Sequence, residues 1–319
     1  MRAAEQPQPS ARADAMRADL ADRERALSDD RRALLAALRR DRLREVAGRA
    51  GAQLLRPGAG APLVLVHPVG GDVLCYGELV RLLPGTYPVY GLAADEALAG
   101  SSAPSFDALV GHYLARLGSA DLRPAVLAGW SFGGMLAYEM VRRLPTAAAV
   151  AIDAMPLPPG TEPQPLTGPE LLEAFALDLI RSAGRRPEQV RLDPQVWQLP
   201  ERTALTCLHA DLAEQGIDVG LTLDELATRA RVYLNAFAAL DRHRSAPGGP
   251  GVRAVWATRS AADARTWWRT VADGPVEGRS VVADHYSVLR PPAVLDVAEF
   301  LHESMARAQA TGSATRRGA

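Results

Sequence analysis

The segment GWSFG at residues 129–133, followed by another glycine, constrains this chain more than any other stretch of its sequence. It lies between a short apolar run, residues 125–128, and a helix-like pattern that begins near Gly133. Glycines two places on either side of a serine leave room for the sharp strand-to-helix turn that exposes its hydroxyl group. The N-terminus of the following helix offers N–H groups to a developing oxyanion. The pattern therefore predicts that Ser131 is a nucleophile.

Strand-like and helix-like segments alternate from about residue 60 onward. Such alternation is typical of an α/β fold with a mostly parallel sheet and helices on both faces. The predicted strands are Leu63–Val66, Tyr87–Leu92, Ala125–Ala128, Ala148–Ile152, Val252–Ala257 and Ser280–Ala283. The predicted helices between and after them are Gly77–Leu83, Phe106–Leu117, Gly133–Leu144 and Ala293–Ala308.

One long interval, residues 156–250, interrupts this alternation because it contains no good strand pattern. Three segments within it have helical spacing instead: Leu171–Arg181, Arg202–Glu214 and Leu223–Arg242. A helical insertion in an α/β sheet usually covers the site at the strand ends. We therefore expect residues 156–250 to form a lid.

The two ends of the chain differ in composition from this central domain. Residues 1–60 are predicted to be a polar segment, a helix over Arg31–Val46 capped by Ser28, and a Gly/Ala/Pro-rich linker. The compact domain is expected to span residues 61–308. Residues 309–319 are small and polar, and are expected to be disordered.

A general base for Ser131 is predicted at His285. This histidine follows the last strand-like run and precedes the last helix, which is where the chain order Ser, Asp, His places the base. His67 follows the first strand and is interpreted as a packed core histidine instead. The role of His285 would be to take the proton of the serine hydroxyl group.

Two carboxylates compete for the role of orienting that histidine. Asp153 ends the strand that follows the nucleophile, whereas Asp263 lies in a polar loop after the next strand. Asp153 is favoured because it follows an apolar run and should be buried at a strand end. Asp284 is adjacent to the base in sequence and is expected to point away from it.

A second glycine cluster, HPVGGD at residues 67–72, follows the first predicted strand. A loop at this position would lie beside the serine and supply an oxyanion donor. The expected oxyanion hole consists of the backbone N–H groups of Val69 and Phe132.

Composition excludes several other kinds of chemistry. All 36 basic residues are arginine, so a Schiff-base lysine and a GxxxxGK phosphate loop are both impossible. Cys75 and Cys207 are far apart and form no cluster with histidines, so no metal site or disulfide framework is expected. A net charge of −1 argues against nucleic-acid partners, and no apolar run is long enough to suggest a membrane span. The expected location is cytoplasmic.

These residues together resemble the releasing thioesterase domains of nonribosomal peptide and polyketide synthases, which have an α/β-hydrolase fold. The matching stretches are LVLVHPVGGDVLCYGELVRLLP, YPVYGL, GWSFGGMLAYEMVRRL, AIDAMPLP and DHYSVLRPP. The resemblance implies a serine thioesterase whose acid follows the strand after the serine, which supports Asp153. It also implies a substrate on the phosphopantetheine arm of a carrier protein or upstream synthase, and no other cofactor.

The sequence leaves three points open. Release by hydrolysis and by macrocyclisation are both compatible with the sequence. The alternatives to a releasing enzyme are a stand-alone editing thioesterase, an acyltransferase or esterase of the same fold, and a non-catalytic binding module. The segment 28–46 is similar to leader helices between synthase modules and is a candidate docking element.

Overall fold

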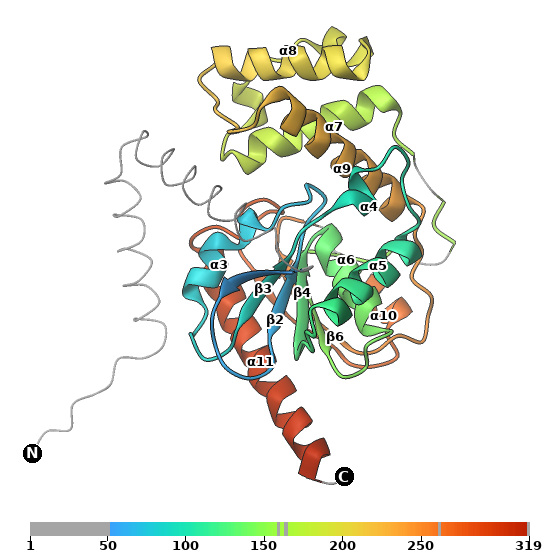
Figure 1. Cartoon of the computed structure of the whole chain (residues 1–319), viewed down its shortest axis with the longest axis vertical. Coiled ribbons are helices and arrows are strands. Elements are labelled where there is room, and N and C mark those ends of the chain that lie inside the picture. The colour runs from blue at the N-terminus through green and yellow to red at the C-terminus, as the bar shows by residue number, and fades with distance from the viewer. Residues whose placement is uncertain (1–51, 158–159, 163–164, 261–262, 318–319) are drawn as a thin grey trace, which may run out of the picture.

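A seven-stranded sheet forms the centre of the molecule (Figure 1). The computed structural model describes residues 52–317, apart from 158–159, 163–164 and 261–262. The strand order is β1-β3-β2-β4-β5-β6-β7, and only the pairing of β1 with β3 is antiparallel among the described strands. The predicted mostly parallel sheet is confirmed. The strands are β1 (Gln53–Arg56), β2 (Leu63–Val66), β3 (Val89–Leu92), β4 (Val126–Trp130), β5 (Ala148–Ile152), β6 (Val252–Ala257) and β7 (Val276–Val281).

Helices cover both faces of this sheet (Figure 1). One face packs against α5 (Phe106–Ser119), α6 (Phe132–Val141) and α10 (Ala264–Val271), and the other against α3 (Gly77–Leu82) and α11 (Ala293–Arg317). Alternate residues of β2 enter the two resulting cores, and every side chain of that strand is fully buried. Burial on both faces explains why the central strands are continuously apolar. The short element α4 (Glu96–Ala99) packs on the first of these faces, and η1 (Leu74–Tyr76) packs on the second.

The direction of the sheet order reverses at β2. The chain passes from β2 to β3 on one side and then to β4 on the other side, so β2 lies between them. In open α/β sheets, the carboxyl ends of strands at such a reversal form the usual ligand crevice. The loops that follow β2 and β4 therefore meet at one place, and they carry the two predicted oxyanion donors.

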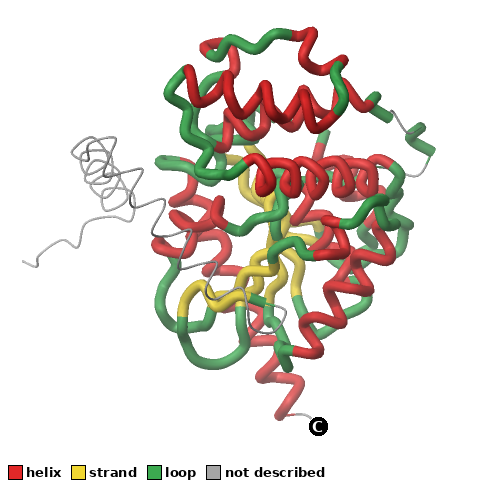
Figure 2. The backbone as a smooth tube through the Cα atoms, turned by 45° about the horizontal axis from the view of Figure 1, so that its top comes forward, coloured by secondary structure: helices red, strands yellow, loops and turns green. Residues whose placement is uncertain are grey.

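The insertion between β5 and β6 forms a separate helical layer above this edge of the sheet (Figures 1 and 2). The three helices expected there are present with shifted ends, and a third apolar cluster, which includes Phe175, Trp197 and Tyr233, holds them together. This layer, called the lid below, contains α7 (Gly168–Ser182), η2 (Pro187–Gln189), η3 (Pro194–Gln198), α8 (Glu201–Glu214) and α9 (Leu223–Asp241).

Two expectations about edge strands were wrong. The sequence predicts a linker over residues 53–56, but they form β1, an antiparallel edge strand on β3. Four residues between Gly/Pro-rich flanks are too few to show an alternating pattern. The last strand begins at Val276 rather than Ser280, because its exposed edge carries charged side chains that mask the apolar signal. The helix predicted over 31–46 lies outside the described residues.

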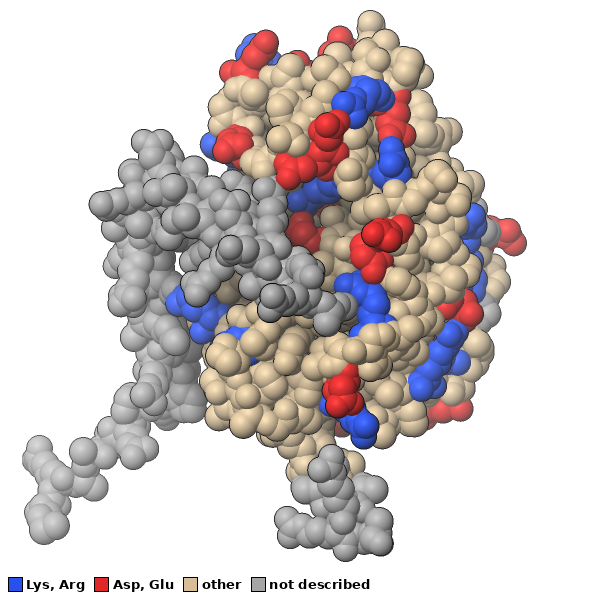
Figure 3. Space-filling model, in the orientation of Figure 1, with Lys and Arg blue, Asp and Glu red and all other residues tan. Residues whose placement is uncertain are grey.

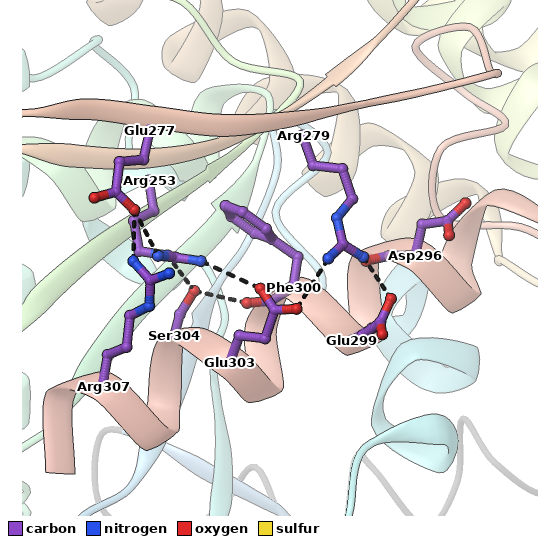
Figure 4. A network of polar contacts seen from close by, with 9 residues as sticks. All are labelled: Arg253, Glu277, Arg279, Asp296, Glu299, Phe300, Glu303, Ser304 and Arg307. Atoms are coloured by element: carbon purple, nitrogen blue, oxygen red, sulfur yellow. Dashed lines mark hydrogen bonds and ion pairs between the residues drawn. The ribbon is translucent and has the colours of Figure 1, made fainter. Parts of the chain in front are cut away.

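The last helix is longer than expected. Residues 309–317 were expected to be disordered, but α11 continues to Arg317, so that expectation was wrong for this stretch. Five of these nine residues, one glutamine, two alanines and two arginines, have high helix propensity although the stretch is polar. Charged side chains tie α11 to the sheet edge (Figure 4): Arg253 and Arg279 of β6 and β7 both bind Glu303, and Glu277 binds Arg307.

Candidate active site

The turn between β4 and α6 holds Ser131 in an unusual backbone conformation. Its φ is 56° and its ψ is −125°, in a region that residues other than glycine rarely adopt. Strain of this kind costs about 1–3 kcal/mol and is typically found at functional sites. The N–H group of Ser131 donates to the carbonyl oxygen of Ile152 at 3.0 Å, which fixes the turn to the end of β5.

The neighbouring glycines are required by close backbone contacts. A Cβ atom on Gly129 would lie 2.2 Å from the carbonyl carbon of Gly133, and one on Gly133 would lie 2.3 Å from the carbonyl oxygen of Val66. A side chain at either position would prevent the helix from starting so close to the strand. The second contact also places the start of α6 against the end of β2.

His285 and Asp153 are joined by a hydrogen bond. The Nδ1–H group of His285 donates to Oδ2 of Asp153 at 2.7 Å. A carboxylate on Nδ1 fixes the tautomer, so that Nε2 is left as the basic nitrogen. Asp153 Oδ1 accepts the N–H group of Ala257 at 2.9 Å, and Oδ2 also accepts the hydroxyl group of Ser260 at 2.7 Å. Three donors therefore surround a side chain that is only 5% exposed.

The histidine lies beside the residue that precedes the serine. The ring of His285 is 5.0 Å from the ring of Trp130, centroid to centroid. Within the described residues, no hydrogen bond joins His285 to the Ser131 hydroxyl group; such bonds often tighten only when substrate binds. Asp284 points away from the base, as expected, because its Oδ1 accepts the N–H groups of Tyr286 and Ser287. These bonds hold the turn that carries His285.

Asp263, the alternative acid, occupies a different position. It is exposed at the start of α10, and the structure gives it no hydrogen bond with His285 in the described part of the chain. Of the two carboxylates considered from sequence, Asp153 is the one that the fold brings to the histidine.

The two expected oxyanion donors lie on adjacent loops. Phe132 is the first residue of α6, where helix N–H groups have no partner within the helix. Val69 follows β2, in a turn closed by the bond from Gly71 N to Pro68 O at 3.0 Å. Because β2 pairs with β4, these two loops leave the sheet side by side.

His67 begins the loop of residues 67–72 that carries Val69, called the Val69 loop below, and its side chain has a structural role. Its side chain is fully buried; Nδ1 donates to the carbonyl oxygen of Pro68 at 2.6 Å, and Nε2 accepts the hydroxyl group of Tyr113 at 2.5 Å. Burial lowers the pKa of His67 to about 4, so the ring is neutral at pH 7. Both nitrogens are occupied, in agreement with the interpretation of His67 as a core histidine.

Sequence reasoning missed a polar contact between the lid and the loops of the site. Arg229 of α9 forms an ion pair with Asp72 of the Val69 loop at 2.8 Å. Asp178 of α7 is 7% exposed and accepts a hydrogen bond from Tyr286, the neighbour of the candidate base. Burial raises the pKa of Asp178, against the attraction of Arg229. The signal in the sequence that could have indicated this contact is an aspartate, Asp178, on the apolar face of α7.

An open pocket of about 670 Å³ borders His285, Tyr286 and Ser260.

A search of the described residues for groups of His, Cys, Asp and Glu able to hold a metal ion finds none. Among the described helices, none combines the length and the apolar character needed to span a membrane.

Comparison with known proteins identifies one family. A family model described as "Thioesterase domain" matches residues 61–305. Nonribosomal peptide synthetase pngA of Aspergillus terreus is 24% identical over 253 residues, which are 73% of this chain and 26% of the synthetase. The chain spans about a quarter or less of the first curated relatives that it matches.

Solved structures agree on the fold. The Vlm2 thioesterase domain superposes with a TM-score of 0.54 at 22% identity, covering 80% of this chain and 98% of that domain. A four-domain nonribosomal peptide synthetase bound to AMP and glycine gives a TM-score of 0.71 at 22% identity, covering 82% of this chain and 21% of the synthetase. The predicted α/β-hydrolase fold is confirmed.

Proposed function

Because the chain belongs to the thioesterase domain family and is similar to part of a nonribosomal peptide synthetase, we propose that it releases an acyl, peptidyl or polyketide chain from a carrier protein. The substrate would be a thioester on the phosphopantetheine arm of that carrier. The observation that carries the proposal is the His285–Asp153 hydrogen bond next to the strained turn that holds Ser131. No resident cofactor is proposed, because the triad and two backbone N–H groups suffice for this chemistry.

The first step forms an acyl-enzyme. Nε2 of His285 takes the proton of the Ser131 hydroxyl group as its oxygen attacks the thioester carbonyl carbon. The carbonyl electrons move onto oxygen, where the N–H groups of Val69 and Phe132 stabilise the charge. When the carbonyl re-forms, the C–S bond breaks and the thiolate receives the proton from His285. Asp153 stabilises the imidazolium that exists between these two proton transfers.

The second step removes the chain from the serine. His285 takes a proton from the incoming nucleophile, which attacks the ester carbonyl, and returns it to the oxygen of Ser131. Water as nucleophile gives a free acid, whereas an amine or hydroxyl group of the chain itself gives a macrocycle. The lid can favour the second outcome by excluding water from the acyl-enzyme.

Product analysis tests this proposal. The protein is incubated with a panel of acyl- and peptidyl-pantetheine thioesters, half of which carry a terminal amine or hydroxyl group. Mass spectrometry separates the free acid from the ring, which is lighter by one water. We expect thiol release at catalytic rates with at least one member, and its loss in Ser131→Ala. Thiol release at an equal rate by Ser131→Ala would contradict the proposal.

A further inference from the structure

The pocket beside His285 carries an unusual excess of positive charge. Five arginines line it, and two carboxylates, Asp284 and Glu188, are the acidic residues among its lining groups. On the face shown in Figure 3, basic and acidic side chains are interspersed. The five arginines, called the arginine rim below, are Arg181, Arg185, Arg186, Arg259 and Arg290.

The charges of the arginine rim are not neutralised by ion pairs. Within the described residues, none of the five has a carboxylate partner within 4.0 Å, whereas Arg229 has one and Arg253 and Arg279 have two each. The carboxylate of Asp284, which lies near Arg259, already accepts two backbone N–H groups. Unpaired arginines facing one pocket repel one another, so an anion between them would be stabilised.

Two members of the rim are held in place by uncharged partners. The guanidinium group of Arg181 lies 5.0 Å from the centre of the Tyr286 ring, and Arg290 donates to the carbonyl oxygen of Arg181 at 2.7 Å. These contacts fix the two side chains without cancelling their charge. Arg185, Arg186 and Arg259 are exposed and free to approach a ligand.

An apolar contact point lies next to the rim. Val282 is 79% exposed, the largest value for a large apolar side chain in the described part of the chain. It belongs to the segment after β7 that is bonded to the rim, since Arg259 N donates to Ala283 O at 3.0 Å. A positive pocket with an adjacent exposed valine is suited to an anionic ligand that belongs to a larger partner.

We propose that the arginine rim binds the phosphate of the incoming phosphopantetheine arm and so directs its thioester toward His285 and Ser131. This inference rests on the proposed function and names the part of the molecule that receives the carrier. Arginine suits the role because its planar fork binds phosphate oxygens in pairs. The chain contains no lysine, so arginine is the only side chain that is always cationic at neutral pH.

The test compares two ligands that differ only in the phosphate group. The dissociation constants of pantetheine and 4′-phosphopantetheine are measured by calorimetry at low salt. We expect the phosphate to tighten binding by about tenfold to a hundredfold, the range for charge-assisted hydrogen bonds. In the triple variant Arg185→Gln/Arg186→Gln/Arg259→Gln, the ratio of the two constants should approach one. These side chains are exposed, so folding should be kept, and circular dichroism checks it.

A matched control and a kinetic arm separate this inference from the proposed function. Arg123→Gln, which removes a 90% exposed arginine elsewhere, should keep the wild-type ratio. The corresponding acyl thioesters should show the same phosphate preference in kcat/KM, mainly through KM. The proposal that the arginine rim binds phosphate would be overturned if the wild type bound both ligands with equal affinity, or if the triple variant kept the wild-type ratio of dissociation constants. This holds even if thiol is released. Phosphate-dependent binding without thiol release would support phosphate binding by the arginine rim and contradict the proposed function.

Discussion

His285 Nδ1 lies 2.7 Å from Asp153 Oδ2, although the two residues are 132 positions apart in the chain. Asp153 stands at the end of β5 with a φ of 43°, a second strained residue next to the strained Ser131. Its backbone N–H group donates to Val255 O at 2.7 Å, which fixes it to β6. Two neighbouring strands thus position a carboxylate that holds a histidine from the loop after the last strand.

The choice between the two acids leads to a direct prediction. Asp153→Asn should reduce kcat for thioester cleavage by about 10⁴-fold, because an amide favours the wrong histidine tautomer. Asp263→Asn should change kcat by less than about twofold, because Asp263 is an exposed residue outside the triad. The kcat values of the two variants, measured with one acyl-pantetheine substrate, decide which aspartate is the acid. A large loss in the Asp263 variant and none in the Asp153 variant would reverse the assignment.

The serine turn should not tolerate side chains at its glycines. Gly133→Ala places a Cβ atom against the carbonyl oxygens of Val66 and His67, and it should destabilise the protein by about 3 kcal/mol or more. Gly77→Ala is the control, because a Cβ atom there has no neighbour within 4 Å; it should be neutral or stabilise α3 by up to about 1 kcal/mol. Urea denaturation measures both. Equal free energies of unfolding would show that the turn is not crowded.

The buried, neutral His67 should make the protein sensitive to acid. Its pKa is about 4 in the fold and 6.5 ordinarily, so between these pH values the unfolded chain binds a proton that the folded chain does not. The associated stability is complete above pH 6.5 and is lost as the pH falls to 4, about 3 kcal/mol in all. His67→Asn lacks this titration. The difference in free energy of unfolding between wild type and variant should therefore shrink by about 3 kcal/mol from pH 7 to pH 4, and a constant difference would contradict a buried neutral ring.

The ion pair between the lid and the Val69 loop should contribute more than an exposed pair. Arg229→Ala leaves Asp72 facing the buried Asp178 without a cation, and should cost about 1–2 kcal/mol. Arg202→Ala, which breaks the exposed pair with Asp224, should cost less than about 1 kcal/mol. Double-mutant cycles with Asp72→Ala and Asp224→Ala give both coupling energies. Equal values would mean that the Arg229 pair is an ordinary surface contact.

Much of the fold could be predicted because its signals are local. The strands around the site are apolar runs, and the GWSFGG turn has a fixed spacing, so Ser131, Phe132 and the loop of Val69 could be placed from sequence. The contacts of Asp153 with the residues at the end of β6 could not be predicted from the sequence, because they depend on which strands are neighbours in the sheet. The edge strand β1 was missed because four residues are too few to show a period.

The contacts of the lid and the pocket could not be predicted from the sequence. Asp178 occurs in an apolar helix pattern, and nothing nearby in the sequence identifies Tyr286 as its partner. The arginine rim is assembled from three distant segments, around residues 181–186, 259 and 290. The local positive charge arises only when these segments lie together in the fold, and the net charge of the chain, −1, does not indicate it.

Intact-protein mass spectrometry after rapid mixing with an acyl-pantetheine thioester tests the central claim, that Ser131 carries the chain. We expect the wild type to gain the mass of the acyl group, and peptide mapping to place it on residue 131. Ser131→Ala should gain nothing while it melts within about 2 °C of the wild type, because the hydroxyl group contributes little to stability. An adduct of equal yield in Ser131→Ala, or one mapped to another residue of the wild type, would contradict the serine mechanism.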